Sequence, residues 1–333
     1  MYYSNFDVRL NELLRWLDIE LDLQIQELKP ASSDASFRRY FRVIHAGGCH
    51  VVMDAPPDKE NIQPFICNAH LLQSAQIHVP AIYQQNLRQG FLLLEDLGSQ
   101  SLLEVLQTEN ADGLYQNALD SLFKLQQNLP IDACPWPAYD EALLTRELGI
   151  FYDWFLEKRL GLVLPVAIRH SLDTFLIDSA LQQPQVCVHR DYHSRNLMVL
   201  PEGDLGVIDF QDAVIGPITY DIVSLLRDCY ISWPEQRVLG WLENYHQRLL
   251  NAEMLNGEFA QFKRWFDLMG LQRHLKAVGI FSRLHLRDDK SGYLADIPRT
   301  MDYILKVCQL YPELAEFHAF LQHQVLPIYQ AHL

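Results

Sequence analysis

A single stretch near the middle of the chain combines acidic, amide and basic side chains at intervals that suit catalysis. It reads V-H-R-D-Y-H-S-R-N over 188–196 and contains the pattern H-x-D-x-x-x-x-N, and Asp209 follows 13 residues after Asn196. Phosphoryl transfer needs one carboxylate at the attacking hydroxyl, and an amide oxygen and a second carboxylate that hold Mg²⁺ against nucleotide phosphates. The stretch therefore predicts a phosphotransferase, with Asp191 as base and Asn196 and Asp209 as metal ligands.

Simpler interpretations compete with this one. An isolated H-x-D is common and usually structural, and His189 and His193 could form a zinc pair, although the sequence suggests no third ligand. The four-part spacing, the apolar flanks and a hairpin that returns Asp209 are together more specific than any single part. Magnesium would also neutralise charge that a protein with a formal charge of −15 otherwise repels.

The segments around this stretch predict the elements that position it. A strand over 185–188 precedes the polar loop, and a hairpin of 197–200 and 205–208 follows it. In the first hundred residues, apolar patterning predicts helices over 5–17, behind a possible cap at Ser4, and over 62–74, and strands over 26–29, 37–44, 49–54, 81–85 and 91–94. Beyond residue 98 it predicts mainly helices, the first over 101–108, 111–128, 138–160 and 165–182.

These elements predict an α+β protein of two lobes. The N-lobe, 1–97, is a small antiparallel β-sheet, and the larger C-lobe, 98–333, is mainly helical, with the two joined at 95–98. A length of 333 residues fits two domains, and 49% apolar residues are enough for a packed core.

Composition excludes several classes of partner. Asp and Glu number 42 against 27 Lys and Arg, so nucleic acid and membrane surfaces are not expected partners. The six cysteines form no C-x-x-C motif, which is typical of a reduced, cytoplasmic protein. The N-terminus has no signal-peptide pattern, and no apolar run is long enough to span a membrane.

Two further motifs resemble a known superfamily. I-D-F at 208–210 and G-P-x-x-x-D at 216–221 are similar to the second and third motifs of the aminoglycoside-phosphotransferase-like small-molecule kinases, which share H-x-D with protein kinases. Within that superfamily, five segments look like those of the bacterial N-acetylmuramate/N-acetylglucosamine anomeric kinases of cell-wall recycling: 33–42, 52–57, 90–98, 272–276 and 293–298.

This resemblance implies a protein-kinase-like fold whose N-lobe binds nucleotide and whose C-lobe carries the catalytic loop and the acceptor site. It implies ATP and Mg²⁺ as cofactors and an amino sugar as partner, phosphorylated at its anomeric C1 hydroxyl. Two alternatives stay open: another small-molecule kinase that acts on a different hydroxyl, and a nucleotide-binding pseudokinase. A protein kinase is less expected, because the segment 211–216 leaves little platform for a peptide.

In the catalytic loop, the resemblance assigns further roles. Arg195 stands where tyrosine kinases also carry an arginine, so it could approach the transferred phosphoryl group or the Asp191 carboxylate, or simply face solvent. His189 is expected to brace the loop rather than to act chemically. Asp221 is implied as an anchor for the loop backbone, with a helix cap as the alternative.

On the nucleotide side, Ser33 and Ser36 lie in a phosphate loop that has no glycine, and their hydroxyl and backbone N–H groups could meet phosphate oxygens. The strand 51–54 has Met or Asp where kinases place a phosphate-binding Lys. We therefore hypothesise that Arg38 or Arg39 supplies this cation, unless both are exposed sheet residues. Around 95–98, backbone groups of Glu95 and Leu97 would bind the adenine edge.

On the acceptor side, Glu147 and Trp154 resemble a family element that faces the acceptor cleft. A carboxylate suits sugar hydroxyls and an aromatic face suits a pyranose ring, although an ordinary core role is as well supported for Trp154. Arg273 and His274, with Lys276, form a basic cluster in an acidic chain and could meet a lactyl carboxylate.

Overall fold

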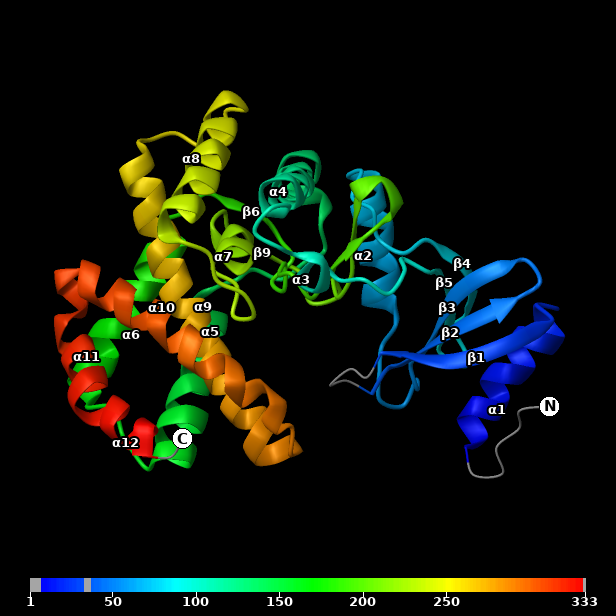
Figure 1. Cartoon of the computed structure of the whole chain (residues 1–333), viewed down its shortest axis with the longest axis horizontal. Helices are drawn as coiled ribbons and strands as arrows, with labels where there is room; N and C mark the ends of the chain where they lie inside the picture. Colours follow the sequence, from blue (N-terminus) through cyan, green and yellow to red (C-terminus); the bar gives the residue numbers. More distant parts are fainter. Residues whose placement is uncertain (1–6, 33–36, 332–333) are drawn as a thin grey trace. The chain divides into compact units, whose positions relative to one another are not determined.

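The computed structural model describes residues 7–32 and 37–331. It divides into two compact units: Met1–Gln100 with Met198–Gln211, and Ser101–Leu197 with Asp212–Leu333 (Figure 1). The sequence predicted a single boundary between residues 97 and 98. In the structure the first unit extends to Gln100, and the hairpin segment Met198–Gln211 also groups with it.

The first unit contains a five-stranded antiparallel sheet of order β1-β2-β3-β5-β4. Its strands are β1 (Ile25–Ser32), β2 (Arg39–His45), β3 (Gly48–Asp54), β4 (Ile82–Asn86) and β5 (Phe91–Glu95). Each predicted strand is present within a few residues of its expected bounds. The β2–β3 hairpin turns tightly, with His45 opposite Gly48 and Arg39 opposite Asp54 at its far end.

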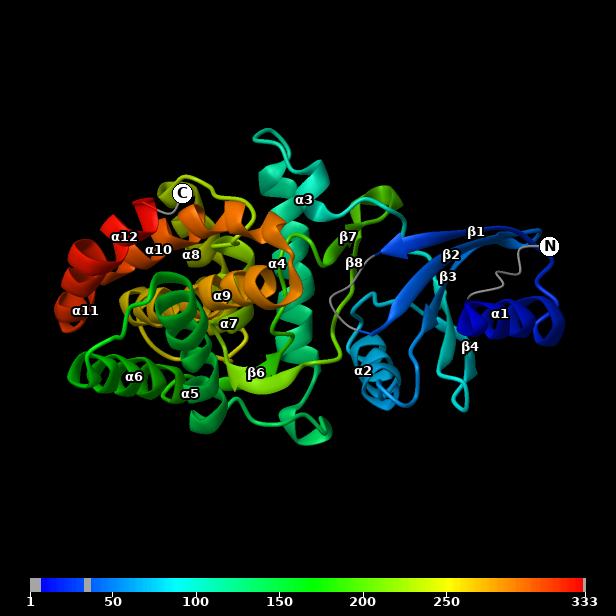
Figure 2. The same cartoon turned by 90° about the horizontal axis from the view of Figure 1, so that it is seen from below.

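The helix α1 (Val8–Arg15) covers one face of this sheet (Figure 2). It begins at the cap Asp7, whose Oδ1 accepts from the Leu10 amide at 2.9 Å, and it continues as the π-helical turn η1 (Trp16–Glu20). The proposed cap Ser4 lies outside the described residues. The core between helix and sheet is made by apolar side chains of α1, η1, β2, β3 and β5: Leu13, Trp16, Leu17, Val43, Val52, Phe91 and Leu93.

The hairpin that the sequence placed after the catalytic loop is present as β7 (Leu197–Val199) and β8 (Leu205–Val207). It ends two residues before Asp209. The first unit also contains α2 (Gln63–Ser74), which agrees with the predicted helix and packs against the residues that follow β8.

The second unit is mainly helical. Its principal helices are α3 (Leu102–Val105), α4 (Ala111–Asn128), α5 (Glu141–Ile150), α6 (Val166–Leu181), α7 (Tyr220–Leu226), α8 (Glu235–Asn251), α9 (Phe259–Asp288), α10 (Ile297–Leu310), α11 (Ala315–Phe320) and α12 (Leu326–Ala331). Shorter turns are η2 (Ile131–Ala133), the π-helical η3 (Phe151–Arg159), η5 (Ser291–Asp296), η6 (Pro312–Leu314) and the π-helical η7 (Leu321–Val325). The predicted helix over 138–160 is therefore α5 continued by η3.

The 30-residue helix α9 runs through the middle of this unit and packs against α5, α6, α7, α10 and η3 (Figure 1). Gly279 permits this packing, because a Cβ at that position would lie 2.6 Å from the backbone of Ile150. A two-stranded ribbon of β6 (Gln185–Val188) and β9 (Val214–Pro217) frames the catalytic loop. The sequence predicted β6 but missed β9, since a four-residue strand ending in Gly-Pro has little propensity of its own and forms by pairing.

The fold class is thus the predicted one: an antiparallel β unit and a larger helical unit. In the described part of the chain, no helix is both long enough and apolar enough to cross a membrane.

Candidate active site

The catalytic loop, 189–196, is anchored at its start by a buried carboxylate. Asp221, in the first turn of α7, accepts hydrogen bonds from the amides of His189 at 2.7 Å and Arg190 at 3.0 Å. Arg190 has a φ of 77°, a left-handed conformation that costs a non-glycine residue about 1 kcal/mol or more. Burial raises the pKa of Asp221 to about 7, although the two amides favour its charged form. Asp221 therefore holds the strained start of the loop.

A second buried carboxylate anchors the other end of the loop. Asp228 Oδ2 accepts from the amide of Ser194 at 2.9 Å and from its hydroxyl at 2.6 Å, while Oδ1 accepts from the Tyr230 amide at 2.8 Å. The sequence reasoning missed Asp228. The signal was available in its position seven residues after Asp221, with only apolar and small residues and Arg227 between them.

Inside the loop, two side chains fix the backbone around Asp191. His189 is buried, its Nδ1 accepts from the Asp191 amide at 3.2 Å, and its ring packs edge-on against Tyr192. The side-chain amide nitrogen of Asn196, Nδ2, donates a hydrogen bond to the Asp191 carbonyl oxygen at 3.0 Å. His189 therefore contacts the loop through a hydrogen bond and through packing.

The Asp191 carboxylate lines a cavity of about 110 Å³ in the second unit. Part of the wall is aromatic and aliphatic, with Tyr230, Ile280 and Phe281. The polar part of the wall includes His193, Ser224, Asp228, Arg273 and Lys276. A carboxylate and two cations therefore share one concave surface, which is the arrangement expected of a binding site for a polar ligand.

Charge around the cavity keeps Asp191 ionised. Burial works to raise the pKa of Asp191, but the positive charge of Lys276, together with His193 and Arg273, outweighs it and holds the pKa below its usual value. An ionised carboxylate can accept the proton of a hydroxyl group.

Glu147 lies beneath this surface rather than on it. Its carboxylate is buried and paired with Arg190 Nη2 at 2.6 Å and Lys276 Nζ at 2.8 Å. It also accepts from Tyr139 Oη at 2.5 Å and Gln272 Nε2 at 3.2 Å. Burial opposes ionisation, but Lys276 and Arg190 lower the pKa of Glu147 to about 2. The sequence predicted that Glu147 contacts substrate; the structure instead makes it the partner that holds Lys276.

The predicted substrate role of His274 is not supported by its position. His274 is fully buried, its Nε2 lies 2.8 Å from the Arg227 carbonyl oxygen, and its ring stacks on Tyr303. The reason is helical geometry: Arg273 and Lys276 are three residues apart and share one face of α9, whereas His274 is rotated about 100° away from Arg273.

Trp154 and Arg195 also lie outside the cavity wall. Trp154, on η3, has Lys158 Nζ 3.5 Å above its ring centre, so a lysine of its own helix covers the face predicted to bind sugar. The exposed Arg195 guanidinium stacks 3.6 Å over Tyr230, and its Nη2 lies 3.9 Å from Asp296 Oδ2. Arg195 thus joins the catalytic loop to the Tyr230 side of the cavity.

Asp209 follows β8 in the first unit and has a φ of 64°, again left-handed. Its Oδ1 accepts from Gln211 Nε2 at 2.6 Å. The next residue, Phe210, is fixed by α2, because its ring packs 4.8 Å from Phe65 and its carbonyl accepts from Asn68 Nδ2 at 2.9 Å. Strained acidic residues held by their surroundings are common at functional sites.

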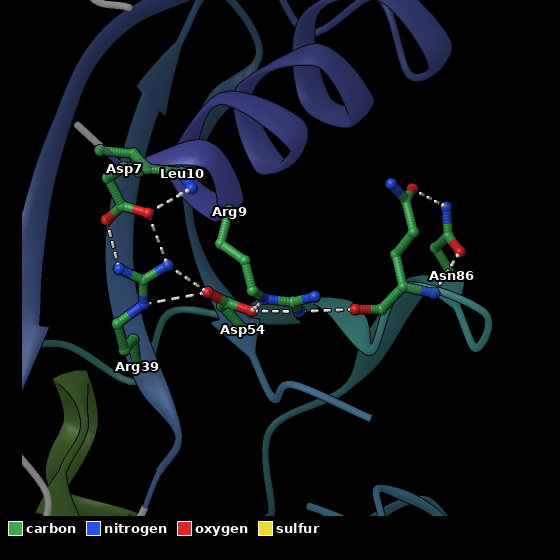
Figure 3. Close-up of polar contacts among 7 residues, drawn as sticks. Asp7, Arg9, Leu10, Arg39, Asp54 and Asn86 are labelled. Carbon is green, nitrogen blue, oxygen red and sulfur yellow. Dashed lines mark hydrogen bonds and ion pairs between the residues drawn. The ribbon is translucent and has the colours of Figure 1, made fainter. Parts of the chain in front are cut away.

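A charge network occupies the place in β3 where kinases carry a lysine (Figure 3). The fully buried Asp54 binds Arg39, with Nη2 to Oδ2 at 2.6 Å, and also pairs with Arg9 of α1. Arg39 Nη1 reaches Asp7 at 2.5 Å, and Arg9 donates to the Gln89 carbonyl at 2.6 Å. We call Asp7, Arg9, Arg39 and Asp54 the Asp54 network. It ties α1 to the sheet.

The arginines predicted to bind phosphate are instead paired with carboxylates of the protein. Arg39 is held by two carboxylates of the Asp54 network, and Arg38 Nη2 pairs with Glu60 at 3.2 Å. A phosphate group would have to compete with these carboxylates for either guanidinium. Ser33 and Ser36 lie outside the described residues.

The predicted adenine-binding segment is held by its side chains. Glu95 Oε1 lies 3.0 Å from His78 Nε2, and Oε2 accepts from the Ala81 amide at 3.2 Å. Leu97 is buried against Gly206, where a Cβ would lie 2.7 Å from Leu97 Cδ1. Both side chains therefore have partners within the protein, which leaves backbone recognition as the role open to this segment.

Arg42, which the sequence reasoning missed, also holds this segment. Its Nε and Nη2 donate to the two Asp96 oxygens at 2.7 and 2.9 Å, and Nη2 also donates to the Gly98 carbonyl at 2.8 Å. Asp96 Oδ1 in turn accepts from the Gly98 amide at 3.0 Å. A bidentate pair of this kind is geometrically specific and would keep the segment in one conformation.

The donors available for a metal ion suit magnesium. Asn196 and Asp209 offer an amide and a carboxylate oxygen, which are hard ligands. Within 7–32 and 37–331 there is no group of three or more His, Cys, Asp or Glu that could hold a metal. Magnesium is commonly bound by only one or two carboxylates together with substrate phosphates, so each of these side chains by itself offers the kind of oxygen that magnesium takes.

Comparison with known proteins agrees with the geometry. The model of the phosphotransferase enzyme family matches residues 27–259. The chain is 50% identical to an N-acetylmuramate/N-acetylglucosamine kinase of Pseudomonas putida, over 93% of this chain and 95% of that protein. It is 40% identical to a kinase of the same name from Neisseria meningitidis, over 93% of this chain and 94% of the relative.

Solved structures share the fold at low sequence identity. The choline kinase LicA from Streptococcus pneumoniae aligns with a TM-score of 0.65 and 12% identity, over 89% of this chain and 99% of that one. The ADP-bound aminoglycoside phosphotransferase APH(2'')-Ib aligns with a TM-score of 0.59 and 14% identity, over 91% and 99% of the two chains.

Proposed function

We propose, since this chain belongs to the phosphotransferase enzyme family, that it transfers the γ-phosphoryl group of ATP to the anomeric C1 hydroxyl of N-acetylmuramate or N-acetylglucosamine. The observation that carries the proposal is the Asp191 carboxylate, ionised and set in the wall of a cavity with Arg273 and Lys276. The names of the relatives that cover almost the whole chain support the choice of sugars.

In the proposed reaction, Asp191 accepts the proton of the C1 hydroxyl while the C1 oxygen attacks the γ-phosphorus. A new P–O bond forms to the sugar, and the bond to the ADP oxygen breaks. The anomeric hydroxyl is more acidic than an ordinary alcohol, so an ionised carboxylate with a lowered pKa is an adequate base. Proton acceptance of this kind contributes about 10²–10⁴ in rate.

Asn196 and Asp209 are the proposed magnesium ligands, and the bound ion would neutralise charge on the nucleotide phosphates. Asp221 and Asp228 keep the loop in position from both ends, so we assign them as positioning residues. The backbone of Glu95 and Leu97 is proposed to bind adenine, in a segment that Arg42 and Asp96 hold in place.

Phosphate binding by Ser33 and Ser36 stays part of the proposal. Arg38 or Arg39 would contribute only if ATP draws one of them from its carboxylate partner. We propose a cytoplasmic reaction, which is supported by six cysteines that are all free thiols.

The test is an assay that identifies the product. The full chain is incubated with ATP, MgCl₂ and each sugar, and ³¹P NMR with a reducing-end assay locates the phosphate. We expect a sugar 1-phosphate and loss of the reducing end. Phosphorylation at another hydroxyl would favour the alternative small-molecule kinase, and nucleotide binding without turnover of either sugar would favour the pseudokinase.

A further inference from the structure

The cation that lines the cavity beside Lys276 lacks a carboxylate partner. Arg273 is half-buried on α9, and no carboxylate oxygen of a described residue lies within 4.0 Å of its nitrogens, the limit for an ion pair. Its Nη2 donates to the Arg190 carbonyl at 3.4 Å, and its guanidinium lies 5.1 Å from the centre of the Tyr220 ring. Its buried Nε has no hydrogen-bond partner.

Neighbouring cations differ from Arg273 in this respect. Arg190 and Lys276 share the Glu147 carboxylate, and Arg195 lies near Asp296. A partly buried cation without a counter-ion is unfavourable. The chain has a formal charge of −15, so it has carboxylates in excess that could have paired with Arg273. The position of Arg273 therefore suits an anion that is not part of the protein.

Two further polar atoms of the same wall have no hydrogen-bond partner. They are the hydroxyl of the fully buried Ser224 and the buried Nδ1 of His193. Buried polar atoms are rarely left unsatisfied. Arg273 can only donate, and Ser224 and His193 can donate as well, so a group rich in acceptor oxygens would satisfy all three.

The size and the apolar part of the cavity wall narrow the choice of ligand. An apolar cavity of about 150 Å³ takes benzene, so 110 Å³ is room for about five non-hydrogen atoms, less than a whole hexosamine. A lactyl substituent has this size. Its carboxylate would meet the donors, while its methyl group would face Ile280 and Phe281.

We propose that Arg273, with Ser224 and His193, forms the subsite that binds the carboxylate by which N-acetylmuramate differs from N-acetylglucosamine. This inference rests on the proposed function and assigns the residue that sets the preference between its two sugars. Arg273 acts in binding, because the lactyl group takes no part in the bonds that form and break at C1.

The experiment compares kcat/KM for both sugars in Arg273→Met, Arg273→Lys and the wild type. Because Arg273 also helps to keep Asp191 ionised, Arg273→Met is expected to lower kcat/KM for both sugars, but the ratio of kcat/KM for N-acetylmuramate to that for N-acetylglucosamine should fall about 30- to 100-fold. Arg273→Lys keeps the charge but not the planar donor geometry, so it should lose less. The matched control is Arg283→Met: this arginine, also on α9, has a buried Nε without a partner but does not line the cavity.

A neutral substrate tests the charge directly. The methyl ester of N-acetylmuramate should be a poorer substrate than the free acid for the wild type, and an equal one for Arg273→Met. If Arg273→Met fails to fold, Ser224→Ala gives the same test with an expected selective loss of about fivefold for the acid.

The outcomes separate the two proposals. Equal losses for both sugars, or no loss for either, would overturn the carboxylate subsite while the proposed function stands. A wild-type protein that phosphorylates neither sugar would overturn the proposed function and the subsite with it.

Discussion

Two groups of buried charge, one in each unit, differ in how completely the protein satisfies them. In the Asp54 network, each guanidinium pairs with a carboxylate, and the fully buried Asp54 is bound by two arginines (Figure 3). In the wall of the cavity, Arg273 has no carboxylate partner among the described residues, and polar atoms of Ser224 and His193 have no hydrogen bond. One group is complete within the protein and the other is not.

This difference teaches how to interpret charged residues that sequence alone makes equally attractive. A network in which every charged group already has a partner binds a ligand poorly, because the ligand must displace one of those partners. An incomplete one has polar atoms whose desolvation is not yet compensated, so it gains from a ligand. We therefore expect mutations in the Asp54 network to change stability and mutations around the cavity to change turnover.

The largest expected effect is on turnover. Asp191→Asn should lower kcat by about 10³-fold, because the amide cannot accept the proton of the sugar hydroxyl. The fold should survive, so the melting temperature should stay close to that of the wild type. Asp178→Asn, a like change at an exposed position of α6, is the control and should keep full activity. A fully active Asp191→Asn enzyme would contradict its role as base.

In the Asp54 network, Asp54→Asn should act in the opposite way. Asp54 is fully buried, but Arg9 and Arg39 are 25% and 37% exposed and keep other partners, so we expect the loss to be about 1–3 kcal/mol. We expect guanidinium chloride titration to show this loss in the free energy of unfolding, with kcat unchanged under conditions where the protein is folded. An increase in KM for ATP without a loss of stability would instead place the network in nucleotide binding.

The sequence predicted the elements of the fold more readily than the contacts among charged residues. Alternating apolar residues and turns are local signals, and the strands, the hairpin after the loop and the helix over 111–128 were predicted from them. The strand β9 was missed because it exists only through its pairing with β6. The two-unit fold followed, since it depends mainly on where strands give way to helices.

For the candidate site, the sequence makes a prediction only where the spacing itself is a signal. Asp191, Asn196 and Asp221 stand at fixed intervals in the motifs, and Asp191 lines the cavity while Asp221 holds the loop. His274 could not be judged in this way, because adjacent residues of one helix face in different directions. The sequence also does not show which of several arginines has a carboxylate as an ion-pair partner in the folded protein.

Asp221 and Asp228, which hold the two ends of the catalytic loop, are buried carboxylates of a third kind, because neither is paired with a cation of the described residues. Asp221 is bound by two amides rather than by arginines, and burial raises its pKa to about 7. Charged neighbours act in both directions: Arg273 lowers this pKa and Asp191 raises it. The folded protein therefore holds the Asp221 proton more tightly than the unfolded chain does.

From this difference we expect a pH dependence of stability. Between about pH 4 and pH 7 the unfolded state ionises Asp221 and the folded state does not, so its contribution to stability falls as pH rises, by about 1.4 kcal/mol for each pH unit. Above pH 7 the contribution is constant. The free energy of unfolding of Asp221→Asn, compared with wild type across this range, should lack this slope. An identical slope in the variant would contradict the raised pKa.

The smallest of these effects concerns the other anchor, which stabilises the loop through neutral donors alone. Asp228→Asn should lower kcat by about 10- to 100-fold, because its single acceptor oxygen cannot accept from Ser194 and from the Tyr230 amide at the same time. KM for ATP should not change, and kcat is calculated per folded protein, measured by circular dichroism, because a general loss of stability would also lower apparent kcat. Ser194→Ala removes only the hydroxyl bond and should cost less. If the two residues act together, the double variant should be no slower than Asp228→Asn, and additive losses would show that Asp228 acts on turnover by another route.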